Sequence, residues 1–282
     1  MKRILVTGAT GRIGRQVVSQ LVKTGALVRA LSRTPETAQL PSEVEVLRGD
    51  LNVPASLDKC LRGVDIVFLI WTASPNAVSD AVKLIVEHAK RVVFLSAPHR
   101  TPHPFFQQPN PIAAMHSEIE SLIEASGISW TFLRPGMFAA NALLWWAPQI
   151  RAGNVVRWVY GAAPTAPIHE RDIAAVAVRT LIDAGHESAD YVLTGPESIT
   201  QLEQIKIISE VIGRSLHFEE MTPEDAKREL PYPPTAVNML LNAWAAAIGQ
   251  PAFVTSQVEE ITGTPALTFH KWVTEHAIEF QA

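Results

Sequence analysis

Apolar residues in the first half of the chain follow two alternating patterns. Short apolar runs are separated by segments in which apolar residues recur every three or four positions. The runs indicate buried strands, and the recurring spacing indicates amphipathic helices. Strands are predicted at Arg3–Thr7, Ala26–Leu31, Val44–Leu47, Asp65–Ile70 and Val92–Leu95, with a sixth between Gly127 and Gly136. Helices are predicted at Arg12–Lys23, after Ser56, at Asn76–Ala89 and at Ile112–Ser126.

Strands that alternate with helices at this spacing predict an α/β fold with a doubly wound parallel sheet. In the second half the alternation loosens and helices predominate, although a strand at Tyr191–Leu193 is expected to return to the sheet. Helices are predicted there at Ile173–Asp183, Gln201–Ile212, Pro223–Leu230, Thr235–Ile248 and around Phe269–Phe280. Asp172 is expected to cap the first of these or to lie in its first turn, and Thr200 and Glu203 form a capping box for the second.

The first predicted strand ends in a glycine-rich turn, Thr7-Gly8-Ala9-Thr10-Gly11-Arg12-Ile13-Gly14. Gly8 allows a tight turn, Gly11 lets the backbone approach a pyrophosphate, and Gly14 lets the following helix pack closely on the strand. The unpaired amides of that helix favour an anion, and Thr10 adds a hydroxyl near the phosphates. A strand, turn and helix in this order predict a dinucleotide-binding (Rossmann) domain, with Arg12 and Ile13 also lining the phosphate site.

The glycine-rich turn therefore suggests how the chain is divided. We expect residues 1–150 to form the dinucleotide-binding domain. We expect residues 151–282 to form a smaller, mainly helical, substrate-binding part that closes over the cleft and returns segments to the sheet.

Residues after the second and third predicted strands indicate which dinucleotide binds. Enzymes selective for the unphosphorylated cofactor usually place an acid after the second strand, whereas this chain has Arg33 there. Arg33 and Arg12 are predicted to bind a 2′-phosphate, which favours NADPH, unless both are simply solvated surface arginines. After the third strand, Asp50 is expected to accept a hydrogen bond from the adenine amino group, and Leu51 is its neighbour in the same motif.

Open α/β sheets hold their ligands at the carboxyl ends of the strands, where Trp71 and Ser96 are predicted to lie. Trp71 is either a wall beside the cofactor or a plain core ring, and Ser96 is a candidate cofactor-binding residue. The proline-rich segment from Ser96 to Pro111 is predicted to be a substrate lid. It contains His99 and His103, but no further ligands at suitable spacing accompany them, so no metal is predicted.

Composition narrows the range of partners. The 282 residues are 47% hydrophobic and carry a formal net charge of -4 without a long run of like charges, which argues against nucleic acid and anionic membranes. A small apolar molecule is the expected partner, with a homodimer as a further option. Cys60 is the single cysteine and the first strand starts at residue 3, so we expect no internal disulfide, no signal peptide and a cytoplasmic location. Polar residues interrupt the longest uncharged stretch, Pro231–Val258, which argues against a membrane span.

Several motifs together resemble the NmrA-like, isoflavone-reductase-like atypical short-chain dehydrogenases. They are the glycine-rich turn, Gly49-Asp50-Leu51, His116 with Glu120, Ser126 to Gly136, Asp172-Ile173-Ala174, Leu193-Thr194-Gly195-Pro196, and Phe269 with Trp272. The resemblance covers nearly the whole chain and implies NADP binding. Similar members include NADPH-dependent quinone and triphenylmethane-dye reductases, phenylpropanoid reductases, and proteins that only sense NADP.

The resemblance also implies a candidate catalytic residue. Ordinary short-chain dehydrogenases use a Tyr-x-x-x-Lys pair, but no tyrosine of this chain has a lysine four positions later. Aligned on Ser126-Gly127-Ile128, His116 stands where phenylpropanoid reductases carry a lysine and quinone reductases a histidine. Its imidazole could donate a proton to a reduced carbonyl or quinone oxygen. Alternatively, His116 pairs with Glu120, four residues on, for structure alone.

These observations lead to one main hypothesis and two alternatives. We expect an NADPH-dependent oxidoreductase that transfers hydride to a small apolar carbonyl, quinone or conjugated acceptor. The alternatives are a non-catalytic protein that senses NADP, and a biosynthetic isomerase or cyclase on the same scaffold.

Overall fold

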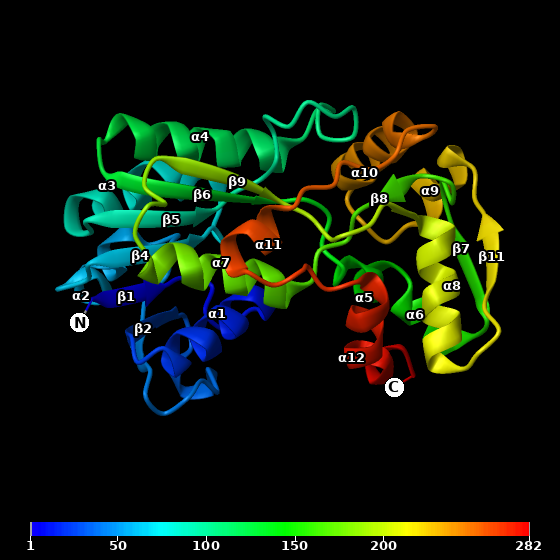
Figure 1. Cartoon of the computed structure of the whole chain (residues 1–282). Coiled ribbons are helices and arrows are strands. Elements are labelled where there is room, and N and C mark those ends of the chain that lie inside the picture. The colour runs from blue at the N-terminus through cyan, green and yellow to red at the C-terminus, as the bar shows by residue number, and fades with distance from the viewer. Residues whose placement is uncertain (1, 282) are drawn as a thin grey trace.

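The predicted strands form one parallel sheet in the computed structural model, which describes residues 2–281 (Figure 1). Its strands, in spatial order, are β3 (Glu45–Arg48), β2 (Leu27–Ser32), β1 (Arg3–Val6), β4 (Ile66–Ile70), β5 (Arg91–Leu95), β6 (Ser129–Pro135) and β9 (Ala189–Leu193). All neighbouring pairs run parallel. The order reverses between β1 and β4, where such sheets bind their ligands. The predicted doubly wound α/β fold is confirmed.

Helices cover both faces of this sheet because successive strand residues point to opposite sides. On β1, Ile4 and Val6 belong to one buried cluster and Leu5 to another. The helices are α1 (Arg12–Lys23), α2 (Asp58–Leu61), α3 (Val78–His88), α4 (Pro111–Ala125) and α7 (Glu170–Ile182). In Figure 1, α1 and α7 lie together below the sheet, and α4 lies above it beside α3. The glycine-rich turn follows β1 and the lid segment follows β5, so both lie at the carboxyl edge of this parallel sheet.

The rest of the second half forms a body at the carboxyl edge of the sheet (Figure 1). Its helices are α5 (Asn141–Trp145), α6 (Ala147–Ala152), α8 (Gln201–Ile212), α9 (Pro223–Glu229), α10 (Pro234–Ala247) and α12 (Phe269–Gln281). α11 (Gln257–Thr262) packs instead against α7 and β9 of the main sheet. Four short strands were not predicted: β7 (Val155–Trp158) pairs with β11 (His217–Glu220), and β8 (Pro164–Thr165) with β10 (Ile199–Thr200). Short 3₁₀ turns, η1 (Pro35–Thr37), η2 (Pro54–Ser56) and η3 (Pro75–Ala77), connect elements of the first half.

Tryptophans form the core of this body. The rings of Trp145, Trp158 and Trp244 lie with their centroids 5.3 to 5.9 Å apart. Trp146 is completely buried beside them, whereas Leu144, on the short helix α5 that precedes Trp146, is 60% exposed. This segment therefore contributes to core packing, and Leu144 and Trp145 also line a cavity.

Local signals for helix ends were largely correct. The predicted capping box of α8 is present. The Thr200 side chain accepts a hydrogen bond from the Glu203 backbone amide, and the Glu203 carboxylate accepts one from the Thr200 backbone amide. α7 starts earlier than predicted, since His169 caps it and Asp172 lies in its first turn. Among residues 2–281, no helix is both long and apolar enough to cross a membrane. Because α7 and β9 pack with the main sheet, the division at residue 150 stays a prediction.

Candidate functional site at the carboxyl edge

The glycines of the turn have different tasks. Gly8 has a φ of +59°, and a Cβ there would come within 3.0 Å of the Ile70 side chain. A Cβ on Gly14 would lie 2.2 Å from the Gly8 carbonyl oxygen. Gly11 is less crowded, with the same oxygen 3.3 Å from its hypothetical Cβ, and it caps α1 without a side-chain hydrogen bond. The fold therefore requires Gly8 and Gly14, whereas Gly11 leaves the helix amides open to a ligand.

A cavity of about 210 Å³ lies against this turn. Its wall consists of Gly8, Gly11, Arg12, Ile13, Gly14, Ile70, Thr72, Phe138, Ala140, Glu170 and Ile173. The Arg12 guanidinium forms an ion pair with Glu279 of α12 at 2.8 Å. The cavity thus has amides and one cation on one side and the start of α7 on the other, which suits a dinucleotide pyrophosphate.

The far side of the turn has the features expected around an adenosine. Arg33 follows β2 and is exposed, and its guanidinium has no ion-pair partner within residues 2–281. Arg48, on the next strand, donates a hydrogen bond to the Arg33 carbonyl oxygen at 2.6 Å. The Asp50 carboxylate accepts from the Asn52 amide at 2.9 Å, and Leu51 is buried. Thr10 is exposed at the turn. Shared use of Arg12 and Arg33 for one phosphate stays a prediction.

A second, larger cavity of about 540 Å³ begins where the first ends, because Ile13, Ile70 and Phe138 line both. Strand ends contribute Trp71, Leu95 and Ser96, and α4 contributes His116. The lid segment contributes Pro98, His99, Phe105, Phe106, Gln108 and Asn110; the opposite wall contains Met137, Asn141, Leu144, Trp145, Met239, Leu240 and Ala243. The cavity is large enough for a nicotinamide and a small organic molecule, and its wall is mainly apolar.

Trp71 has the core position considered for it, and its place beside the cofactor stays a prediction. The residue is 8% exposed and packs in the core cluster on the α3 side of the sheet, yet it also lines the larger cavity. Its buried indole N–H has no hydrogen-bond partner among the described residues. An unsatisfied buried donor is unusual in a folded protein.

A buried carboxylate organises the strand ends beneath the lid. Glu120 is completely buried and accepts two hydrogen bonds from Arg134, at 2.8 and 2.9 Å. The Ser96 hydroxyl also donates to it, at 2.6 Å. His99 Nε2 lies 3.4 Å from the other Glu120 oxygen, a distance typical of an ion pair rather than a well-aligned hydrogen bond. Since Ser96 donates its proton to Glu120, the lone pairs of its oxygen remain for a ligand.

The predicted pair between His116 and Glu120 is wrong. His116 Nδ1 donates instead to the Ile112 carbonyl oxygen at 2.7 Å, and the ring stacks on Phe94. Glu120 is turned toward Arg134, a contact that helix spacing alone does not reveal. Burial lowers the pKa of His116, so its ring is neutral at pH 7 and Nε2 is an acceptor. Protonation in acid would turn Nε2 into a proton donor in the cavity wall.

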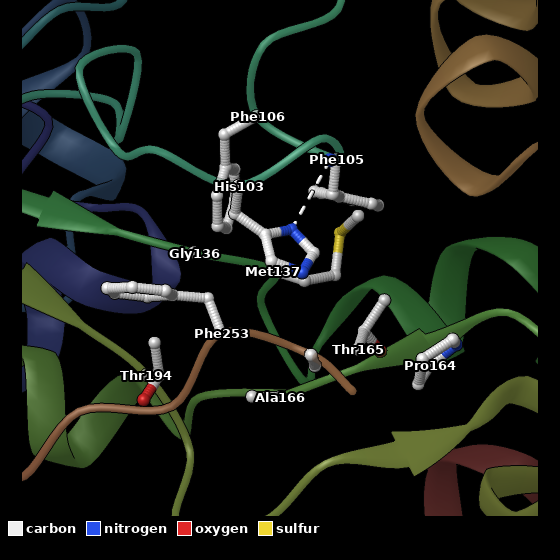
Figure 2. Close-up of a pocket in the computed structure, with 11 residues that line it drawn as sticks. His103, Phe105, Phe106, Gly136, Met137, Pro164, Thr165, Ala166, Thr194 and Phe253 are labelled. Carbon is white, nitrogen blue, oxygen red and sulfur yellow. Dashed lines mark hydrogen bonds between the residues drawn. The ribbon is translucent and has the colours of Figure 1, made fainter. Parts of the chain in front are cut away.

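The lid is anchored to the C-terminal half (Figure 2). His103 Nε2 donates to the Pro251 carbonyl oxygen at 3.0 Å. Figure 2 shows the second contact, in which His103 Nδ1 accepts from the Phe105 amide at 3.3 Å. The rings of His103 and Phe253 lie 6.4 Å apart, between centroids. The hollow in Figure 2 has a volume of about 10 Å³, which leaves room for about one water molecule and not for an organic ligand.

Several cavity residues were not singled out from the sequence. Phe105, Phe106 and Phe138 are aromatic residues near proline-rich or irregular segments, which was an available signal for an apolar ligand wall. Met239, Leu240 and Ala243 come from α10, whose sequence is typical of any buried helix. Only the docking of α10 over the sheet edge gives these residues a place in the site.

The fold and the two joined cavities define a dinucleotide-binding protein with an adjoining site for an apolar molecule. The glycine cradle and the exposed Arg33 fit a nicotinamide dinucleotide. Residues 1–269 match the model of the NmrA-like family, and the chain belongs to this family.

Relatives of known name share its full length. The chain is 40% identical to (4-alkanoyl-5-oxo-2,5-dihydrofuran-3-yl)methyl phosphate reductase of Streptomyces griseus, over 98% of this chain and 99% of that protein. It is 32% identical to NAD(P)H azoreductase of Xenophilus azovorans, over 99% of both chains. The structure of NADPH-dependent quinone oxidoreductase QOR2 of Escherichia coli in complex with NADPH matches with a TM-score of 0.83 and 25% identity, over 96% of this chain and 99% of that one.

Proposed function

We propose that this protein is an NADPH-dependent reductase that transfers hydride to a small, mainly apolar acceptor with a conjugated carbonyl or quinone. The observation that carries the proposal is the continuity of the two cavities, which joins the glycine-rich turn to an apolar chamber of about 540 Å³. The relatives support it, because they are named as reductases of a quinone, an azo compound and a butenolide phosphate. The cytoplasm is the compartment we propose.

The cofactor site uses residues from successive strand ends. Gly8, Gly11 and Gly14 with Thr10, Arg12 and Ile13 would hold the pyrophosphate, Arg33 the 2′-phosphate, Asp50 and Leu51 the adenine side, and Trp71 and Ser96 the nicotinamide side. When bound, NADPH supplies the hydride. The lid and α10 exclude water from the place where the acceptor would lie, which favours direct transfer.

His116 is the proton donor in this proposal. It lines the acceptor chamber, and its Nε2 has no hydrogen-bond partner among residues 2–281. Because its pKa lies below the ordinary value of 6.5, the protonated form is a minor but more acidic species at neutral pH. For a carbonyl acceptor, kcat/KM should therefore rise as the pH falls toward the pKa of His116. A quinone should depend less on His116, because its reduced form is a more stable anion that water can protonate.

Steady-state oxidation of NADPH tests the proposal with a panel of quinones, azo compounds, enones and alkanoyl butenolides with and without a phosphate. His116→Ala should lower turnover of carbonyl acceptors by roughly a hundredfold, with NADPH affinity unchanged. His88→Ala is the matched control, since His88 makes the same Nδ1 contact with the carbonyl four residues earlier, at 2.9 Å, but lies outside the cavity. Unchanged turnover in His116→Ala would remove His116 from the mechanism. Tight NADPH binding without turnover on any acceptor would favour the NADP sensor.

A further inference from the structure

A line of charged side chains connects the C-terminal helix to the glycine-rich turn. Arg12 of the turn pairs with Glu279 of α12 at 2.8 Å, and Glu279 also lies 2.6 Å from His276 Nδ1. His276 Nε2 lies 3.0 Å from Glu170, the first residue of α7. We call Arg12, Glu279, His276 and Glu170 the relay. It starts and ends in the wall of the turn cavity, because Arg12 and Glu170 both line that cavity.

The inner half of the relay is rigidly held. Glu170 accepts a hydrogen bond from the indole of the fully buried Trp272 at 2.8 Å, and the same indole stacks on His276 with the ring centroids 4.6 Å apart. His169, on the far side of Glu170, is buried and pairs with Glu275 at 3.2 Å. The outer half is more exposed, with 48% of the Arg12 side chain accessible. Arg12 is therefore the member free to move.

Charge within the relay depends on His276. Both of its ring nitrogens face carboxylates, so only the doubly protonated imidazolium donates to both. The hydrogen bond with Glu170 raises the pKa of His276, and Glu279 adds to this although burial opposes it. Burial alone would raise the pKa of Glu170, but the neighbouring imidazoles of His169 and His276 bring it well below its usual range. Bonding to Arg12 lowers the pKa of Glu279.

We propose that the relay is an accessory part of the cofactor site, in which the pyrophosphate draws Arg12 away from Glu279 and His276 takes up a proton as the cofactor binds. The proposal rests on the proposed position of the pyrophosphate at the glycine-rich turn. Once Arg12 neutralises the pyrophosphate, Glu279 interacts with His276 alone and stabilises its positive charge more strongly. Glu170 faces the same anion, so a charged His276 also offsets its repulsion.

The proposed coupling between proton uptake and cofactor binding predicts the direction in which pH changes the affinity for the cofactor. If the pKa of His276 is higher in the complex than in the free protein, binding takes up protons between the two values, and affinity falls as the pH rises through them. A pKa difference of one unit corresponds to an uptake of about 0.5 proton at the midpoint and to a total change of roughly tenfold in affinity. Arg171 and Lys271 are paired with Glu275, whereas His169 lies between Glu275, at 3.2 Å, and the relay carboxylate Glu170, at 3.3 Å. These contacts do not involve Glu279, the carboxylate that Arg12 leaves, so we expect His276 to account for most of the change.

Isothermal titration calorimetry with NADP⁺, in buffers of different ionisation enthalpy from pH 6 to 9, measures the protons taken up. The 2′-phosphate itself titrates near pH 6, as phosphate monoesters do, so the informative quantity is the difference between wild type and His276→Gln. We expect the wild type to take up a few tenths of a proton more than His276→Gln. Glu279→Gln and Arg12→Gln should abolish the same part of the uptake. His270→Gln, an exposed position on the same helix, should keep it.

The outcomes separate this inference from the cofactor site on which it rests. Equal uptake by wild type and His276→Gln, or full uptake in Arg12→Gln, would overturn the relay while NADP⁺ still binds. Glu279→Gln replaces a side chain that is 37% exposed and so tests the relay even if His276→Gln does not fold. Failure of Gly11→Val to weaken NADP⁺ binding would instead overturn the position of the pyrophosphate.

Discussion

Replacing Glu120 by Gln removes the charge of the buried carboxylate while keeping its shape. In the wild type, Arg134 is 4% exposed in its side chain and donates two hydrogen bonds to Glu120. An amide in place of the carboxylate presents one acceptor and one donor, so one Arg134 N–H would face an N–H group. Asp190 remains as a partner of Arg134 on the other side. Breaking a buried ion pair on one side typically destabilises a protein by about 3–5 kcal/mol.

For a chain of 282 residues, with an unfolding entropy of about 2.1 cal/mol/K per residue, that loss corresponds to a fall in melting temperature of roughly 5–8 °C. Differential scanning calorimetry measures it, with Glu124→Gln as the control, because Glu124 lies one turn further along α4 and its carboxylate is 3.8 Å from the half-exposed Arg100, which also approaches Glu120 at 3.7 Å. The control should change the free energy of unfolding by less than about 1 kcal/mol. A loss below about 1 kcal/mol for Glu120→Gln would refute the assigned importance of the Glu120–Arg134 pair. An equal loss of stability in Glu124→Gln would also refute it.

The remaining predictions concern the cofactor site and the C-terminal helix. Gly11→Val should fold and bind NADP(H) at least roughly a hundredfold more weakly, as expected for a blocked phosphate site. Gly14→Ala should mainly lower the melting temperature, because its Cβ would meet the Gly8 carbonyl oxygen at 2.2 Å. Arg33→Ala should weaken NADPH binding by about tenfold or more and leave NADH binding unchanged; equal effects on both cofactors in calorimetry would contradict the 2′-phosphate assignment. His276→Gln should be destabilised relative to the wild type most fully below pH 6.5, and this difference should shrink as the pH rises through the raised pKa of the folded state; a difference that grows with pH in thermal denaturation would contradict the ion pair.

The sequence predicts the parts of this protein that depend on local patterns. The parallel sheet follows from short apolar runs such as Ile66–Ile70, and α1 starts and ends at the predicted residues. The end of α10 was predicted within one residue, because Gly249 and Pro251 follow it in the sequence. In the structure Gly249 has a positive φ of 79°, as expected for a helix end. These signals act within a few residues and need no knowledge of the tertiary fold.

Features that depend on distant contacts were missed or mistaken. His116 and Glu120 have the spacing of a helical pair, but Arg134, from the adjacent strand, takes the carboxylate. The small strands β7 and β11 are partly exposed and short, so their apolar pattern is weak. Arg12 and Glu279 are 267 residues apart, and only the docking of α12 brings them together. The glycine-rich turn could therefore be predicted, whereas its connection to the C-terminal helix could not.

The position of the deuterium after reaction with NADPH deuterated at C4 of the nicotinamide tests the central claim most directly. A conjugated enone is the suitable acceptor, because hydride added to carbon does not exchange with water as a quinol proton does. Both C4 epimers of the labelled cofactor are used with the wild type, and the product is analysed by mass spectrometry. The proposed direct transfer predicts that one epimer delivers its deuterium to the reduced acceptor and the other does not. Reduced acceptor without deuterium from either epimer would contradict direct hydride transfer in the joined cavities.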